Sequence, residues 1–287
     1  MNSNNILILI SLFSLSFCIY PIAVFHGIVD SCQMKNTSKL VSDLQRDLGV
    51  HVECIEIGNG FLDTIVEPLE TQVEEACDKI RSNPNFQSKF SVLGISQGTL
   101  IGRYIIEKCE MEGQVMRYLA LDGPQMGIGS IPKLQCGKVC DFIVSLTAPL
   151  FYKLQDIIAP AAYFRYKYDQ EYYMENNKFL KMLNNENDEK DEEIYNRFTS
   201  LEKVKLIKNE ADTVIVPKNS SWFTFYDFNG EEIVPLEESD FYISDYIGLR
   251  KLNEEGKVNF TSFKGEHVIY DVVEYWEEIV PFFSDEY

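Results

Sequence analysis

Residues 90–99 read FSVLGISQGT, an apolar run that leads into a Gly-x-Ser-x-Gly pattern. The run FSVL is typical of a short buried strand, and a helical pattern leaves the motif and continues to Cys109. A serine between two glycines at such a junction is typical of a nucleophile elbow, in which a tight turn presents the hydroxyl group. The alternative is an ordinary glycine-rich turn between a strand and a helix. The sequence therefore predicts Ser96 as a nucleophile.

Strand and helix patterns alternate on both sides of this motif. Apolar residues at helical spacing lie between 40 and 48 and between 69 and 80, each after a strand pattern. This alternation predicts an α/β fold with a mainly parallel sheet and helices on both faces. The strand patterns occupy 22–25, 52–57, 90–93, 115–121, 204–207 and 258–263.

The segment between the fourth and fifth strand patterns has a different character. It is helical, interrupted by prolines and rich in Tyr and Phe, with a charged run at 187–193. We expect a helical insertion at about 127–203 on a single domain of residues 21–287, and not an independent domain.

The histidine count limits the choice of catalytic base. A serine hydroxyl needs a base to take its proton, and in α/β-hydrolases that base is a histidine that follows both the serine and the acid in the chain. The chain has three histidines, and His26 and His51 both precede Ser96. His267 is therefore predicted as the base, and we expect His26 to fix a turn.

The acid and the oxyanion hole are predicted from strand ends. Glu210 and Asp212 follow the strand pattern at 204–207, and Asp212 is preferred because it opens the run DTVIVP. Glu210 remains the alternative, and either carboxylate can also be a solvated loop residue. An oxyanion hole needs two backbone N–H donors, for which we expect Gln97 and Ile28.

The N-terminus and the cysteines indicate the compartment. Residues 6–20 carry no charge and are too few to span a bilayer comfortably, so we expect a signal peptide at 1–20, the alternative being an uncleaved anchor. Six cysteines remain after it, which allow fifteen pairings. Together with three N-x-Ser/Thr sequons they predict an oxidising, glycosylating compartment. The sequons begin at Asn36, Asn219 and Asn259.

Charge and motifs exclude several classes of function. The 287 residues hold 26 Lys and Arg against 45 Asp and Glu, a net charge of −19, which argues against nucleic acid as a partner. The sequence has no H-E-x-x-H motif, no phosphate-binding glycine loop and few histidines. We therefore expect no cofactor and no metal.

Eight segments run in order along the chain: FHGIVDSC (25–32), GISQG (94–98), PQMG (124–127), CDFI (140–143), SWFTFY (221–226), IVPLE (233–237), YIGLR (246–250) and GEH (265–267). Taken together, these segments resemble the palmitoyl-protein thioesterase family. The resemblance implies an α/β-hydrolase fold, lysosomal residence and hydrolysis of long-chain acyl thioesters, including S-palmitoyl cysteine in proteins or peptides. It places Ser96, Asp212 and His267 in the triad, and Gln97 and Ile28 at the oxyanion positions.

The resemblance also implies disulfides between Cys77 and Cys109 and between Cys136 and Cys140. In family members the cysteine that corresponds to Cys32 is followed by another cysteine, whereas here Gln33 follows. Cys54 is the cysteine that remains, which suggests a Cys32–Cys54 pair.

The resemblance further gives the insertion a task as a lipid-binding lobe with a slot for the acyl chain. The residues expected to line this slot are Leu146, Leu150, Phe151, Ile157, Ile158, Tyr163 and Phe164.

Two alternative functions remain open at this point. One is an acyl-CoA thioesterase or lipid esterase of the same fold, and the other is a lipid-binding protein without catalysis. We expect a monomer that is located in the lysosome or secreted.

Overall fold

The computed structural model describes residues 19–130 and 149–284. Six strands form one sheet in the order β2-β1-β3-β4-β5-β6, and every neighbouring pair is parallel. The predicted parallel α/β architecture is therefore confirmed. The strands are β1 (Ile22–Phe25), β2 (Val52–Ile55), β3 (Lys89–Ile95), β4 (Gln114–Leu121), β5 (Lys203–Asn209) and β6 (Val258–Phe263).

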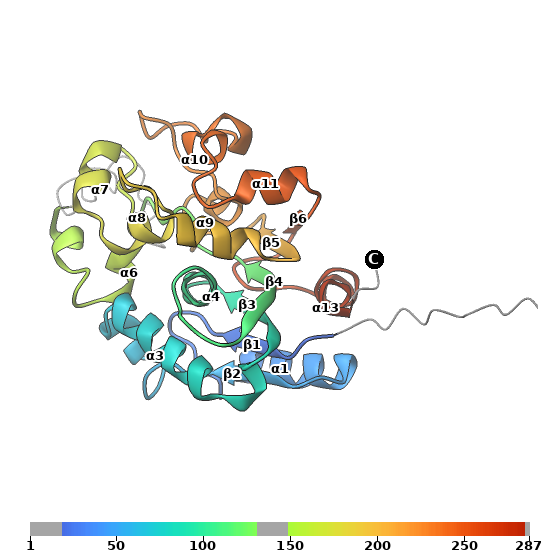
Figure 1. The fold of residues 1–287 in the computed structure, drawn as a ribbon. Coiled ribbons are helices and arrows are strands. Elements are labelled where there is room, and N and C mark those ends of the chain that lie inside the picture. Colours follow the sequence, from blue (N-terminus) through green and yellow to red (C-terminus); the bar gives the residue numbers. More distant parts are fainter. Residues whose placement is uncertain (1–18, 131–148, 285–287) are drawn as a thin grey trace, which may run out of the picture.

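Helices cover both faces of the sheet (Figure 1). Alternate residues of β1 enter two separate hydrophobic clusters, one shared with α3 and α4 and the other with α1 and α13. The helices are α1 (Lys35–Leu48), α2 (Asp63–Val66), α3 (Leu69–Ser82), α4 (Gly98–Glu107), α6 (Ala159–Ala162), α7 (Gln170–Asn176), α8 (Phe179–Leu183), α9 (Glu192–Thr199), α10 (Asp240–Ile243), α11 (Leu249–Glu254), α12 (Val272–Glu274) and α13 (Val280–Ser284). Short 3₁₀ turns lie at Pro84–Phe86, Lys218–Trp222 and Leu236–Glu238, and a π turn lies at Tyr275–Ile279.

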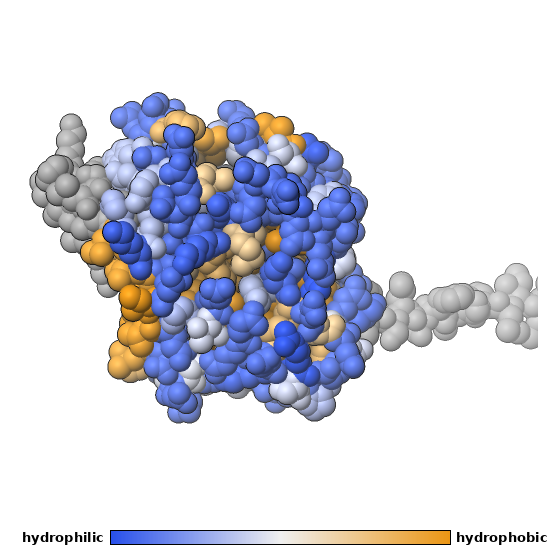
Figure 2. Space-filling model, turned by 60° about the vertical axis from the view of Figure 1, so that its left-hand side comes forward, coloured by the Kyte–Doolittle hydropathy of each residue, from blue (hydrophilic) through white to orange (hydrophobic). Residues whose placement is uncertain are grey.

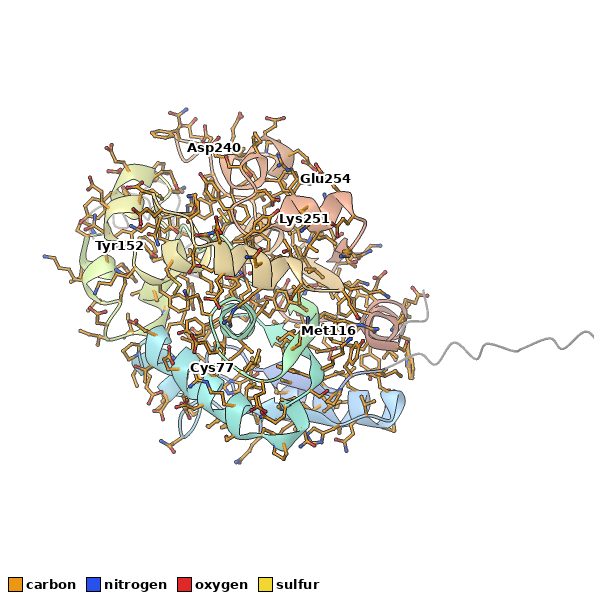
Figure 3. The ribbon with its side chains drawn as sticks, viewed as in Figure 1. Cys77, Met116, Tyr152, Asp240, Lys251 and Glu254 are labelled. Carbon is orange, nitrogen blue, oxygen red and sulfur yellow. A yellow bond between two sulfur atoms is a disulfide. The ribbon has the colours of Figure 1, made fainter. Side chains whose placement is uncertain are left out.

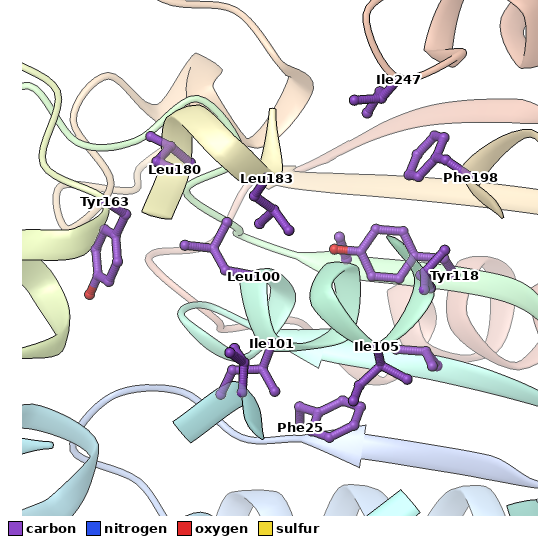
Figure 4. Packing of buried hydrophobic residues seen from close by; sticks show 14 of the residues in the cluster. Phe25, Leu100, Ile101, Ile105, Tyr118, Tyr163, Leu180, Leu183, Phe198 and Ile247 are labelled. Atoms are coloured by element: carbon purple, nitrogen blue, oxygen red, sulfur yellow. The ribbon is translucent and has the colours of Figure 1, made fainter. Parts of the chain in front are cut away.

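Helix α4 lies at the centre of the larger cluster (Figure 4). Its side chains Leu100 and Ile105 are fully buried, between Phe25 of β1 on one side and Leu183 of α8 on the other. Burial of a Leu or Ile side chain contributes roughly 1.5–3 kcal/mol. The helix that follows the Ser96 turn is thus fixed by packing on two sides.

The described part of the insertion contains α6 to α9, of which α8 and α9 pack against α4, and α6 packs against α2 and α3. Arg103 of α4 pairs with Glu107 at 2.8 Å, and both side chains are fully buried. The Arg103 guanidinium also donates to Asn184 Oδ1 and to the Leu183 carbonyl, both at 2.8 Å. The insertion and the sheet therefore share one core.

Two disulfides lie within the described residues. One joins Cys77 of α3, which is labelled in Figure 3, to Cys109 just after α4, and the other joins Cys32 to Cys54 of β2. These are the pair implied by the resemblance and the pair inferred from the remaining cysteine. Closing loops of this length stabilises a fold by about 3–4 kcal/mol. The expected Cys136–Cys140 pair and the expected signal peptide up to Cys18 lie outside the described residues.

One face of the molecule is largely hydrophilic (Figure 2). Apolar residues gather along its left-hand edge, with smaller apolar areas near the centre and the top. Among the described residues, no helix has both the length and the apolar content needed to cross a membrane.

Candidate active site

Ser96 lies in a strained turn between β3 and α4. Its φ of 51° is in the left-handed region, which residues with a side chain rarely adopt. The flanking glycines are required by close contacts: a Cβ at Gly94 would lie 2.5 Å from Cα of Thr99, and one at Gly98 would clash with the carbonyl oxygen of Phe25. This is the geometry of a nucleophile elbow.

His267 connects Ser96 to Asp212. His267 Nε2 lies 2.9 Å from Ser96 Oγ, and Nδ1 lies 2.7 Å from Asp212 Oδ2. A carboxylate oxygen only accepts, so Nδ1 carries the proton and Nε2 accepts the hydrogen bond from the serine hydroxyl. The other carboxylate oxygen of Asp212 accepts from the backbone N–H groups of Val214 at 2.7 Å and Ile215 at 3.1 Å. Three donors thus hold the Asp212 side chain, which is fully buried.

The alternative acid, Glu210, points to other partners. Its carboxylate pairs with Lys218 at 2.8 Å and with Lys208 at 3.2 Å. The hydrogen bond from Lys218 holds the pKa of Glu210 below its usual value. Of the two carboxylates that follow β5, Asp212 is the one that contacts His267.

A second buried carboxylate, Asp122, lies at the same site and was missed by the sequence reasoning. It follows β4 directly, and its Oδ2 is 3.9 Å from His267 Nδ1. Oδ2 accepts from the Val268 N–H and from Asn209 Nδ2, both at 2.6 Å, and Oδ1 accepts from the Asn209 N–H at 2.7 Å. Burial raises the pKa of Asp122, while the hydrogen bonds from Asn209 and Val268 act in the opposite direction. No motif marks this residue in the sequence.

Asp122, Asp212 and His267 are also spaced closely enough to hold a metal ion. However, the carboxylate oxygens that face His267 already accept hydrogen bonds from the protein. The donor set fits a hydrogen-bonded network better than a metal site.

The two expected oxyanion donors flank Ser96. Gln97 follows it directly, and a Cβ at Gly27 would lie only 3.1 Å from Ser96 Cβ, so the loop that carries Ile28 faces the serine. The His26 ring is buried: Nδ1 donates to the Gly27 carbonyl at 3.1 Å, and Nε2 accepts from the Ile57 N–H at 3.2 Å. The His26 side chain therefore fixes the turn.

A cleft of about 620 Å³ opens beside Ser96 and His267, within the usual size range of ligand pockets. Its lining is mostly apolar and comes from the loop after β1, the start of α1, the ends of β3 and β4, and the loops after β5 and β6. The lining includes Ile28, Val29, Met34, Leu40, Ile95, Leu121, Val214, Val268 and Tyr270.

The lining of this cleft includes none of the described insertion residues that were expected to line an acyl slot, although the Tyr163 hydroxyl donates to the side chain of Gln97 at 3.0 Å. Phe164 is part of the core, whereas Leu150 and Ile157 are more than half exposed to solvent. Leu146 lies outside the described residues. Within the described part of the chain, the apolar space beside Ser96 is formed by the sheet's own loops and not by the insertion.

The three sequons differ in exposure. Asn36 on α1 and Asn259 on β6 are exposed, and Asn219 is half-buried. Asn36 also lies at the edge of the cleft.

The known proteins to which this chain is similar in sequence are thioesterases. The sequence profile described as "Palmitoyl protein thioesterase" matches residues 21–267. Palmitoyl-protein thioesterase 3 of Dictyostelium discoideum is 30% identical over 267 residues, which cover 92% of this chain and 90% of that protein. Lysosomal thioesterase PPT2-B of Xenopus laevis is 29% identical over 251 residues, which cover 85% of each chain.

Among solved structures, a hyperthermophilic esterase from the archaeon Pyrobaculum calidifontis matches with a TM-score of 0.50. The sequences are 11% identical, and the match covers 93% of this chain and 77% of the esterase. At this level of identity the likeness concerns the fold alone.

Proposed function

Because the chain belongs to the palmitoyl-protein thioesterase family, we propose that it hydrolyses long-chain acyl thioesters with Ser96, His267 and Asp212 as its catalytic triad. The chain is a thioesterase of the α/β-hydrolase fold. The observation that carries the assignment of the triad is the continuous hydrogen-bonded series from Ser96 Oγ through His267 to Asp212.

In the proposed reaction, Ser96 Oγ attacks the thioester carbonyl carbon while His267 Nε2 takes the hydroxyl proton. The oxyanion is stabilised by the N–H groups of Gln97 and Ile28. As the C–S bond breaks, the imidazolium returns its proton to the sulfur, and the thiol leaves. His267 then deprotonates a water molecule, which attacks the acyl carbonyl carbon. As the bond to Ser96 Oγ breaks, the imidazolium returns its proton to Oγ, and the fatty acid leaves.

Asp212 has the role of orienting the imidazole in this cycle. It keeps the proton on Nδ1, so that Nε2 is free to accept the serine proton, and its charge stabilises the imidazolium. Its own position is set by the Val214 and Ile215 N–H groups.

The lining of the cleft supports a long acyl chain as the substrate group. Transfer of each methylene from water to an apolar environment contributes about 0.8 kcal/mol. The apolar side chains that line the cleft, among them Ile28, Leu40 and Tyr270, offer such an environment directly beside the serine. We propose S-palmitoylated cysteine in proteins or peptides as the substrate class.

The test is hydrolysis of a palmitoyl-cysteine peptide, of palmitoyl-CoA and of a matched oxygen ester, by the wild-type protein and by Ser96→Ala. We expect the wild type to act on the peptide and to be labelled at Ser96 by a fluorophosphonate probe, and Ser96→Ala to lose both properties. Hydrolysis by Ser96→Ala at the wild-type rate would show that Ser96 is not the nucleophile and would contradict the proposed mechanism. A preference for the CoA or oxygen ester would replace the proposed substrate, and absence of any turnover would favour a lipid-binding protein.

We also propose that the protein acts in the secretory pathway, in the lysosome or after secretion. The two disulfides, the exposed sequons at Asn36 and Asn259, and the lysosomal Xenopus relative support this location. Cell fractionation, together with a mass shift after glycosidase treatment, tests it.

A further inference from the structure

The loop that carries the proposed oxyanion donor Ile28 adopts an unfavourable backbone conformation. Val29 has a φ of 58°, and a β-branched residue in the left-handed region is a true outlier. Such a conformation persists only where the surrounding structure imposes it. The Val29 side chain is half exposed, so packing of that side chain does not hold the loop in place.

A hydrogen bond from Val29 to Thr64 holds this loop. The Val29 N–H donates to Thr64 Oγ1 at 2.8 Å, and the same hydroxyl donates to the Phe61 carbonyl at 2.6 Å. The hydroxyl is thereby oriented to accept from Val29. Thr64 lies in α2 and is almost fully buried, at 1% exposure.

Thr64 also contacts the other side of the proposed oxyanion hole. Its carbonyl oxygen accepts from Gln97 Nε2 at 3.0 Å and from Gln72 Nε2 at 3.2 Å. Gln97 Nε2 donates in addition to Gln72 Oε1 at 3.0 Å. A single residue of α2 therefore bonds both to Val29, next to Ile28, and to Gln97.

The amide oxygen of the Gln97 side chain accepts a hydrogen bond from a residue of the insertion. Gln97 Oε1 accepts from the Tyr163 hydroxyl at 3.0 Å, and Figure 4 shows this hydroxyl directed away from Leu180. Both N–H donors and the oxygen of the Gln97 amide thus have partners, which fixes the orientation of the amide. Among these partners, Thr64 is the one that reaches both donor-bearing segments.

We propose that Thr64 is a positioning residue for the oxyanion hole, which sets the Ile28 and Gln97 N–H groups at the separation that the tetrahedral intermediate requires. The inference rests on the proposed function. Catalysis by such donors depends on their being placed before charge develops on the substrate oxygen. Displacement of a catalytic group by about 1 Å can cost on the order of 10²-fold in rate. Loss of the Thr64 hydroxyl is therefore expected to lower kcat and to leave substrate binding little changed.

Thr64→Val and Thr64→Ser form a matched pair for the test. Valine keeps the shape and removes the hydroxyl, whereas serine keeps the hydroxyl. With a palmitoyl thioester, we expect Thr64→Val to lower kcat by about 10–100-fold with KM within about twofold of wild type. Thr64→Ser should stay within about threefold of wild-type kcat.

A transition-state analogue distinguishes positioning from a general loss of structure. A long-chain trifluoromethyl ketone forms an oxyanion on Ser96, whereas free palmitate does not. Thr64→Val should lower the affinity for the ketone by about the same factor by which it lowers kcat, and it should leave the affinity for palmitate unchanged. Equal weakening of both ligands, or an unchanged ketone affinity, would overturn the proposal.

Glycine at position 29 provides an independent test, because it adopts a positive φ without strain. In the double variant Thr64→Val/Val29→Gly, the loop no longer needs the hydroxyl to hold that conformation. We therefore expect its kcat to be at least fivefold higher than that of Thr64→Val. The single variant Val29→Gly is the reference. Absence of recovery together with a Thr64→Val melting temperature far below wild type would assign Thr64 a structural role and overturn the proposal. Ser96→Ala distinguishes the proposed function from the role of Thr64. If Ser96→Ala stays active, the proposed function is wrong. If Thr64→Val has the kcat of the wild type, only the role proposed for Thr64 is wrong.

Discussion

The carboxylate of Asp122 lies 3.9 Å from Nδ1 of His267, behind the 2.7 Å contact that Asp212 makes with the same nitrogen. Because Asp122 also accepts the Val268 N–H, it holds the backbone directly after His267, where Val268 has a φ of 53°. Two buried carboxylates therefore act on one imidazole, one through contact and one through the loop and its charge.

We predict that Asp122→Asn lowers kcat/KM by about 10–100-fold and shifts the acidic limb of its pH profile to lower pH. All three partners of Asp122 are donors, so an amide places N–H against N–H. Removal of a negative charge near His267 makes the imidazolium less stable, hence the direction of the shift. The pH dependence of kcat/KM on a soluble acyl thioester is the measurement. If the maximum of kcat/KM falls but the acidic limb of the pH profile does not shift, Asp122 has only a structural role.

Asp212→Asn is predicted to reduce kcat by about 10⁴-fold, because an amide at this position favours the wrong tautomer of His267. Glu210→Gln is the matched control, since this carboxylate lies on the same loop and pairs with Lys208 and Lys218. It should retain wild-type kcat. Steady-state kinetics of both variants decide, and a large loss in Glu210→Gln alone would reverse the assignment of the acid.

The buried Arg103–Glu107 pair predicts how stability depends on pH. Burial raises the pKa of Glu107 to about 7, against the opposing effect of Arg103. A carboxyl group whose pKa is higher in the folded state stabilises the fold below its unfolded pKa, and this contribution is lost as the pH rises through the folded pKa. The contribution of this group to the free energy of unfolding should therefore fall by up to about 3 kcal/mol between pH 4.5 and 7.5.

Thermal melts across this pH range test the Glu107 contribution, with Glu107→Gln as the comparison. The difference in melting temperature between wild type and Glu107→Gln should change in favour of the wild type as the pH falls. A difference that stays constant with pH would contradict the assigned pKa.

The acyl-chain preference is predicted to depend on Met34, which lines the cleft just before α1 and is 42% exposed. Met34→Glu places a charge in the apolar lining, while a carboxylate at a helix N-terminus is favourable for the fold. We expect KM for a palmitoyl substrate to rise by about tenfold and KM for a hexanoyl substrate to change little. Met34→Leu serves as the control, and an equal effect on both chain lengths would argue against an acyl chain in this cleft.

The sequence predicted those parts of the fold and of the site that depend on local pattern. Strand runs and helical spacing predict the parallel sheet, and the Gly-x-Ser-x-Gly pattern places Ser96 at a strand end. The order of Ser96, Asp212 and His267 along the chain then restricts the partners, and the structure brings these three side chains together.

Other features of the site depend on contacts between distant segments. Asp122 comes close to His267 because β4, β5 and β6 are neighbours in the sheet, and no residue pattern near Asp122 indicates that contact. Thr64 meets Val29 across 35 positions of sequence. The resemblance to the family implied that the insertion holds the slot for the acyl chain. Side chains such as Phe164 are instead used in the core shared with α4.

The Cys32–Cys54 bond has a consequence for where the protein can work. Cys32 lies in the loop between β1 and α1 that carries Ile28, and the bond fastens this loop to β2. Reduction would remove this covalent tether and leave the loop held by hydrogen bonds, such as those from the Val29 N–H to Thr64 and from the Cys32 N–H to Glu56. A molecule in a reducing compartment would keep Ser96, His267 and Asp212 but lose the covalent tether of the loop beside them, so we expect its activity to depend on the redox state of its surroundings.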